Sequence, residues 1–151
     1  LTLFVMSDTL KESYNNGVMP YVEGQIEEKD AFTSSIEPFH TFMMSQVGEK
    51  ELELFLDLGQ VDRTDMKKED TPLTSLIPAF MISELKRAFE IGFLIFLPFL
   101  VIDLAIASIL MSMGMMMLPP VIISLPFKII FFVLIDGWAL LSGALVESFF
   151  N

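Results

Sequence analysis

The sequence predicts an all-α, membrane-protein-like fold, in which a polar helical insert is followed by kinked hydrophobic helical hairpins. Charge is distributed very unevenly. The chain has 151 residues and a net charge of -11, and 53% of its residues are hydrophobic. Residues 1–90 carry 17 of the 20 acidic side chains, whereas residues 91–151 carry three acids and a single base, Lys128. Residues 104–127 contain no charge at all. An apolar stretch of this length is typical of membrane-spanning helices.

The same charge distribution divides the chain into three parts. Residues 1–10 are apolar at their start, and we expect them to be the end of a hydrophobic helix whose beginning is missing. Residues 11–75 form the polar, acidic helical insert, and residues 76–151 form the hydrophobic hairpin with a methionine-rich tip at 111–120.

Local signals within the insert predict turns and short helices. Asn15–Gly17 and Gly24 are typical of turns. Serines followed by a proline over Ser34–Pro38 predict the start of a helix. A second short helix is expected to end at Gly59, and residues 60–72 are expected to form a loop.

The hairpin is predicted from two long apolar arms on either side of a breaker-rich connection. Ile91–Met113 and Val121–Val146 would each extend roughly 35–40 Å as helices, enough to cross a bilayer core. Gly114 and the two prolines that follow it place the tip between the arms. Each arm also contains a proline, which is expected to kink it. The candidate hinge and kink residues are therefore Pro98, Gly114, Pro119, Pro120 and Pro126.

Three charges, Asp103, Lys128 and Asp136, interrupt the apolar arms. Ionisable groups in such segments are costly and usually face a partner or a water-filled cavity. At ~1.5 Å per residue they lie about 21, 16 and 28 Å from Met117, so Asp103 and Lys128 can meet across the hairpin. An ion pair that fixes helix register is favoured, because buried pairs are commonly structural. A proton relay and an aspartyl active site remain open.

Catalytic and ligand-binding signals are otherwise weak. The sequence before Asp136 lacks the glycine, two residues earlier, that intramembrane aspartyl proteases are expected to have. The chain has no cysteine, and therefore no thiolate metal site or disulfide framework. His40 is the only histidine, and a lone histidine is more often a surface or packing residue than a ligand. We expect neither a metal nor a cofactor. The acidic surplus also argues against nucleic-acid binding, which needs a basic face.

The tip of the hairpin is unusually rich in methionine. Five of the seven residues from Met111 to Met117 are methionine, and Gly114, Pro119 and Pro120 lie within or beside the cluster. Methionine is flexible and packs against different shapes, so it specifies a rigid core poorly. Met115, Met116 and Met117 are therefore predicted to form an apolar gasket around a pore, because a hydrophobic constriction can block ions and water.

Several motifs along the second half of the chain resemble the FliP family of the flagellar protein export gate, which has relatives in virulence type III secretion. They are Ser83–Lys86, Ile91–Phe93, Pro98–Leu100, Ile102–Asp103, Met115–Met117, Pro119–Pro120, Leu125–Lys128 and Asp136–Trp138. The resemblance runs almost unbroken from Leu76 to the end of the chain and is weaker over residues 7–75.

The resemblance implies a subunit of the bacterial inner membrane that is not an enzyme. About five copies would assemble with FliQ and FliR into a helical ring around a channel for unfolded export substrates. FlhA and FlhB would act on the cytoplasmic side, and FliO would aid assembly. The resemblance also implies that the gate is partly raised towards the periplasmic level. A generic helical ion channel or transporter subunit, with Asp103, Lys128 and Asp136 in an ion path, is the alternative function.

Staggered copies in such a ring give Lys128 a second possible partner. Glu84 lies about 50 Å from the tip along its own arm, too far to reach Lys128 within one straight hairpin. Glu84 and Lys128 are therefore predicted to bridge adjacent subunits, and Asp103 is the fallback partner.

Overall fold

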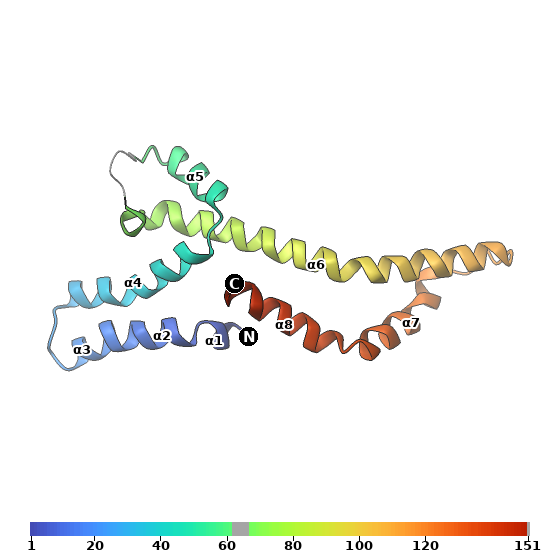
Figure 1. Ribbon diagram of the computed structural model, residues 1–151, viewed down its shortest axis with the longest axis horizontal. Helices are drawn as coiled ribbons and strands as arrows, with labels where there is room; N and C mark the ends of the chain where they lie inside the picture. The colour runs from blue at the N-terminus through green and yellow to red at the C-terminus, as the bar shows by residue number, and fades with distance from the viewer. Residues whose placement is uncertain (62–66, 151) are drawn as a thin grey trace. The chain divides into compact units, whose positions relative to one another are not determined.

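The computed structural model describes residues 1–61 and 67–150 (Figure 1). Nearly all of them are helical, and none forms a strand, which confirms the all-α class. The chain divides into two compact units, Leu1–Arg87 and Ala88–Asn151, and the boundary falls within α6. The elements are α1 (Thr2–Val5), α2 (Ser7–Ser13), η1 (Tyr14–Val18), α3 (Met19–Val22), α4 (Glu28–Gln46), α5 (Glu49–Leu58), η2 (Lys68–Asp70), α6 (Leu73–Ser112), α7 (Pro120–Leu134) and α8 (Gly137–Phe150).

The first unit is built on an antiparallel pair, in which α4 packs against α2, η1 and α3 (Figure 1). The predicted turn at Asn15–Gly17 is wrong, because Tyr14–Val18 forms a π-helical turn that continues α2 into α3. Close packing explains the difference. Gly17 is buried against α4, and Ser13 Oγ donates a hydrogen bond of 2.8 Å to the Ser35 carbonyl. A residue without a side chain is needed here to let two backbones approach, not to reverse the chain.

Replacing Gly17 with alanine is expected to destabilise the protein. A Cβ at this position would lie 2.8 Å from both the Ala31 carbonyl oxygen and the Ser35 amide nitrogen, which are backbone atoms that cannot turn aside. Such overpacking costs about 1–3 kcal/mol. The measurement is the thermal or urea midpoint in detergent. Gly92→Ala is the matched control, because no described atom outside the backbone of its own helix lies within 4 Å of a Cβ there. An equal midpoint in the two variants would contradict the close approach.

Helix α4 of the insert starts earlier than the sequence predicts. α4 begins at Glu28, so the predicted helix start at Ser34–Pro38 is wrong. Glu27 has an extended conformation that starts the helix, and the acidic side chains in its first turn favour the positive end of the helix dipole. Pro38 lies inside the helix, where its ring removes one backbone hydrogen bond without ending the element.

The other turn and cap predictions of the insert are confirmed where the structure describes them. Gly24 has φ +72°, a left-handed turn conformation. α5 ends at Leu58 with Gly59 as its C-cap. In the predicted loop over residues 60–72, Lys68–Asp70 form a single 3-10 turn, and residues 62–66 lie outside the described part of the chain.

The second unit contains the hairpin formed by the later part of α6 with α7 and α8 (Figure 1). α6 ends at Ser112, where the Met115 N–H donates to the Leu110 carbonyl and the Gly114 N–H donates to the Met111 carbonyl. This bond pair is a Schellman motif, which needs a left-handed residue, and Gly114 has φ +72°. Pro120 then starts α7.

The second arm is two helices, so the predicted single helix Val121–Val146 is wrong. α7 and α8 meet at 62° across Ile135 and Asp136 (Figure 1). Asp136 has φ 51°, and Gly137 lies against the ring of Phe132, where a Cβ would come within 2.3 Å. The Asp-Gly pair is a common turn signal and could have predicted the break. Pro126 lies inside α7.

Candidate functional site

Helix α6 is long and apolar enough to cross a membrane, and the bent pair α7–α8 passes the same criteria when taken together. Only 6% of the most apolar window of α6 is buried inside the chain. The core helix of a soluble protein is mostly buried, so this helix needs another apolar environment, either lipid or further subunits.

The charged residues of the hairpin meet where α7 lies beside α6. Lys128 Nζ lies 2.7 Å from Asp103 Oδ2, and Ser124 Oγ donates a hydrogen bond of 2.5 Å to Asp103 Oδ1. Ser124 is completely buried, and the two charged side chains are about one-quarter exposed. Each carboxylate oxygen therefore has its own donor, as a charge in an apolar segment requires. This arrangement fixes one register of α7 against α6.

Ser124 is a site residue that sequence reasoning missed. Serine is common in apolar helices, and its hydroxyl can bond to the preceding turn of its own helix. Ser124 Oγ does lie 3.1 Å from the Val121 carbonyl. Its spacing from Lys128, one helical turn, was the available signal, because residues four apart share a helix face.

An aromatic cluster covers the same region of the hairpin. Phe99 of α6 contacts Phe131 and Phe132 of α7, with ring centroids 6.3 and 6.2 Å apart. Phe132 also packs edge-on against Trp138 of α8, with centroids 5.2 Å apart. Phe99, Phe132 and Trp138, together with Lys128, line an open groove of about 510 Å³. The cluster joins all three helices of the unit around the bend.

Asp136 lies away from this charged pair, at the break between α7 and α8. Its backbone carbonyl accepts hydrogen bonds from Ala139 and Leu140, which begins α8. Its side chain is exposed. Within residues 1–61 and 67–150 the partners of the Asp103 carboxylate are Ser124 and Lys128, and no hydrogen bond joins the two aspartates. The arrangement is thus one ion pair and one separate exposed acid.

The methionine tip is exposed in the chain. Met115 is 45% exposed, Met116 81% and Met117 96%. Of these three residues, Met115 takes part in the turn, and it does so through its backbone: its N–H donates to the Leu110 carbonyl, and its carbonyl accepts from the Leu118 N–H. The side chains are therefore free to pack against something outside the chain.

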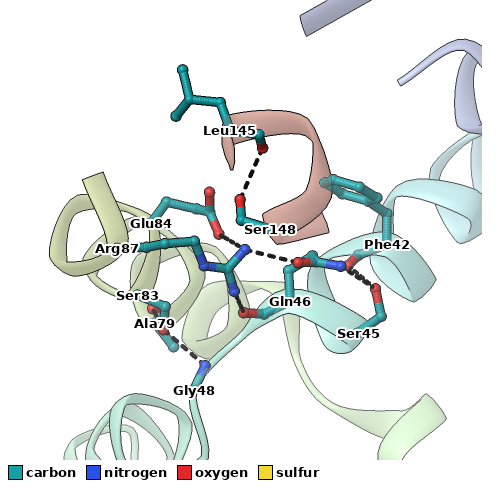
Figure 2. Close-up of polar contacts among 10 residues, drawn as sticks. All are labelled: Phe42, Ser45, Gln46, Gly48, Ala79, Ser83, Glu84, Arg87, Leu145 and Ser148. Atoms are coloured by element: carbon teal, nitrogen blue, oxygen red, sulfur yellow. Dashed lines mark hydrogen bonds and ion pairs between the residues drawn. The ribbon is translucent and has the colours of Figure 1, made fainter. Parts of the chain in front are cut away.

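Glu84 belongs to a polar cluster in the first unit, where α6 meets the corner between α4 and α5 (Figure 2). Arg87 Nη1 donates to Gln46 Oε1 at 2.9 Å, and Nη2 donates to the Gln46 carbonyl at 3.2 Å. Arg87 Nη1 also lies 3.3 Å from Glu84 Oε1, a buried atom that forms no hydrogen bond with the residues that the structure describes. Ser83 Oγ accepts a 2.9 Å bond from the Gly48 N–H. The cluster therefore holds the corner on α6, a role that the sequence did not predict for Gln46, Ser83 or Arg87.

Two smaller contacts hold the same unit together. Glu51 lies 3.3 Å from Lys86, and its pKa is lowered by a hydrogen bond from its own backbone N–H and by Lys86. His40 Nε2 lies 2.8 Å from the Thr71 carbonyl and joins α4 to the segment before α6. His40, the sole histidine of the chain, therefore has a structural role, because it connects two segments of the first unit.

Comparison with known proteins gives a consistent family. The model of the FliP family matches residues 1–145. The chain is 58% identical to a flagellar biosynthetic protein FliP of Caulobacter vibrioides and 53% identical to one of Rhizobium meliloti, in each case over 99% of this chain. It is 50% identical to the protein of that name from Bacillus subtilis. The chain spans 56%, 61% and 67% of these three relatives.

Proposed function

This chain belongs to the FliP family, and on that premise we propose that it is a pore-forming subunit of the flagellar or type III protein export gate. Unfolded export substrates would pass the bacterial inner membrane through the assembled gate. The observation that carries the proposal is the match to flagellar biosynthetic proteins along almost the whole chain. The exposed apolar surface of α6 and the exposed methionine tip support it, because both need partners outside the chain.

The proposed partners follow from the same premise. About five copies would surround the channel together with FliQ and FliR. FlhA and FlhB would act on the cytoplasmic side of the gate, and FliO would aid its assembly. The exposed side chains of α6 would face lipid or neighbouring subunits. Met115, Met116 and Met117 would line the narrowest part of the channel, where flexible apolar side chains can close around different substrates.

A chimera tests the function directly. The matching residues of the Caulobacter vibrioides relative are replaced with this chain, and the chimera is expressed in a strain that lacks its own FliP. Restored motility and secretion of flagellar subunits are the expected results. A chimera that reaches the membrane at the normal level and yet restores neither would overturn the proposal. The negative control is a chimera in which Met115, Met116 and Met117 are each replaced by a polar residue.

Neither aspartate is expected to carry protons, so removing either charge should change export only as far as it changes assembly of the gate. Asp103→Asn leaves Lys128 without a carboxylate at 2.7 Å and is expected to lower the level of assembled gate. Asp136→Asn is expected to have a small effect, because its side chain is exposed at the bend. Gate level in detergent extracts and secretion are the two measurements. Loss of secretion with a normal gate level, in either variant, would instead favour a proton path.

A further inference from the structure

Thioether sulfur is concentrated at one exposed place in this chain. Five methionines lie between Met111 and Met117, and the most exposed of all the described methionines are Met116 and Met117, at 81% and 96%. Elsewhere Met81 is 53% exposed and Met19 42%. The chain has no cysteine, so its thioethers are the side chains that a two-electron oxidant attacks first.

We propose that the hairpin tip is an oxidation site, at which hypochlorous acid converts Met116 and Met117 to sulfoxides and thereby weakens the seal. The second half of this inference rests on the proposed function. The sulfur lone pair attacks the chlorine of HOCl, forming a chlorosulfonium ion and releasing hydroxide. Water then adds to sulfur as chloride leaves, and two protons are lost. Sulfur is oxidised by two electrons, chlorine is reduced to chloride, and the net products are sulfoxide, chloride and a proton.

The tip is a place where this modification changes polarity without changing the fold. The turn is closed by backbone bonds from Met115 to Leu110 and from Gly114 to Met111, and none of them uses a sulfur atom. Residues 104–127 carry no charge, so a sulfoxide would introduce a strong dipole into an otherwise uncharged segment. A sulfoxide attracts water and packs poorly in apolar surroundings. The oxidised tip should therefore keep its backbone shape and admit water.

The first measurement maps the site independently of gate function. The full-length chimera is purified in detergent and treated with increasing hypochlorous acid, and peptides are analysed by mass spectrometry. Sulfoxide is expected at Met116 and Met117 at several-fold lower oxidant than at Met19 or Met81. Equal oxidation of all four methionines would overturn the proposal. This result does not depend on whether the chimera restores motility, which separately tests the proposed function.

The second measurement connects the modification to sealing. Cells that carry the chimera are exposed to oxidant, and uptake of a small solute is measured in the wild type and in a variant with Met115, Met116 and Met117 all changed to leucine. Leucine keeps apolar bulk but cannot form a sulfoxide. After oxidant treatment, uptake is expected to rise several-fold over its untreated level in the unmutated chimera, and to show no such rise over its own untreated level in the leucine variant. The chimera with Met19→Leu and Met81→Leu should respond to oxidant as the unmutated chimera does. An equal rise in the leucine variant would overturn the link between these sulfoxides and the leak.

Discussion

Replacing Met115, Met116 and Met117 together by alanine is expected to raise leakage of ions and small solutes several-fold while the hairpin still folds. The three side chains are 45%, 81% and 96% exposed, so they add little to the core of their own unit. In a ring, each copy would contribute the same three side chains to one constriction. Alanine removes most of that flexible apolar bulk and leaves a wider opening that water can wet.

Conductance across membranes that contain the assembled gate measures this effect, and the gate level in detergent extracts shows whether assembly survives. The triple leucine variant is the first control, because it keeps the apolar bulk and should stay closed. Met81→Ala is the second, since it removes a half-exposed methionine of α6 that lies far from the tip in the sequence. Conductance of the alanine variant equal to that of the wild type would return the three residues to ordinary packing.

The hydrophobic hairpin could be predicted well, because its low charge content extends over a long segment and its helix-breaking residues are clustered at one place. More than fifty residues with three charges are typical of helices in an apolar environment, and Gly114, Pro119 and Pro120 leave one place for the chain to reverse. Composition over a long window averages out local exceptions. Counting the helical rise from the tip also predicted that Asp103 and Lys128 could pair across the hairpin, and in the structure Lys128 Nζ lies 2.7 Å from Asp103 Oδ2.

Short elements were predicted less well, because tertiary contacts decide them. Glycine at position 17 is compatible with a turn or with close helix packing, and only the neighbouring α4 distinguishes the two. Pro38 can start a helix or be tolerated inside one, and here the helix starts ten residues earlier, at Glu28. The break at Asp136 depends on a ring, Phe132, that packs where a side chain at Gly137 would lie. Local propensity does not contain this information.

Charge reversal at Lys128 is expected to cause the other large effect, the loss of assembled gate. Lys128→Glu puts a second carboxylate beside Asp103, where Nζ now lies 2.7 Å from Oδ2. Two like charges with little access to water repel strongly, and Ser124 can satisfy only one of them. Native mass measurement of the detergent-solubilised complex gives the oligomer level. Lys11→Glu is the matched control, because Lys11 and its partner Asp8 are 74% and 88% exposed and such surface pairs contribute little.

Two double variants then identify the partner that matters for assembly. Asp103→Lys with Lys128→Glu restores an opposite-charge pair within one hairpin, at the site that the structure shows. Glu84→Lys with Lys128→Glu restores a pair only if Glu84 and Lys128 of adjacent copies meet, as the sequence predicts. In the chain, Glu84 lies 3.3 Å from Arg87, so Glu84→Lys also places two bases side by side. Glu84→Gln is therefore measured alongside Glu84→Lys, since glutamine removes the negative charge without placing a second positive charge next to Arg87.

Partial recovery of the oligomer in the Glu84→Lys, Lys128→Glu double variant would support a bridge between subunits. It would mean that on assembly Lys128 interacts with an acid beyond its partner in the chain. It would also mean that Glu84, whose buried Oε1 forms no hydrogen bond within the described part of the chain, gains a donor there. Recovery in the Asp103→Lys double variant alone would place the essential pair inside one subunit. The inter-subunit prediction for Glu84 would then be wrong, and Asp103, Ser124 and Lys128 would act only to set the register of α7 against α6.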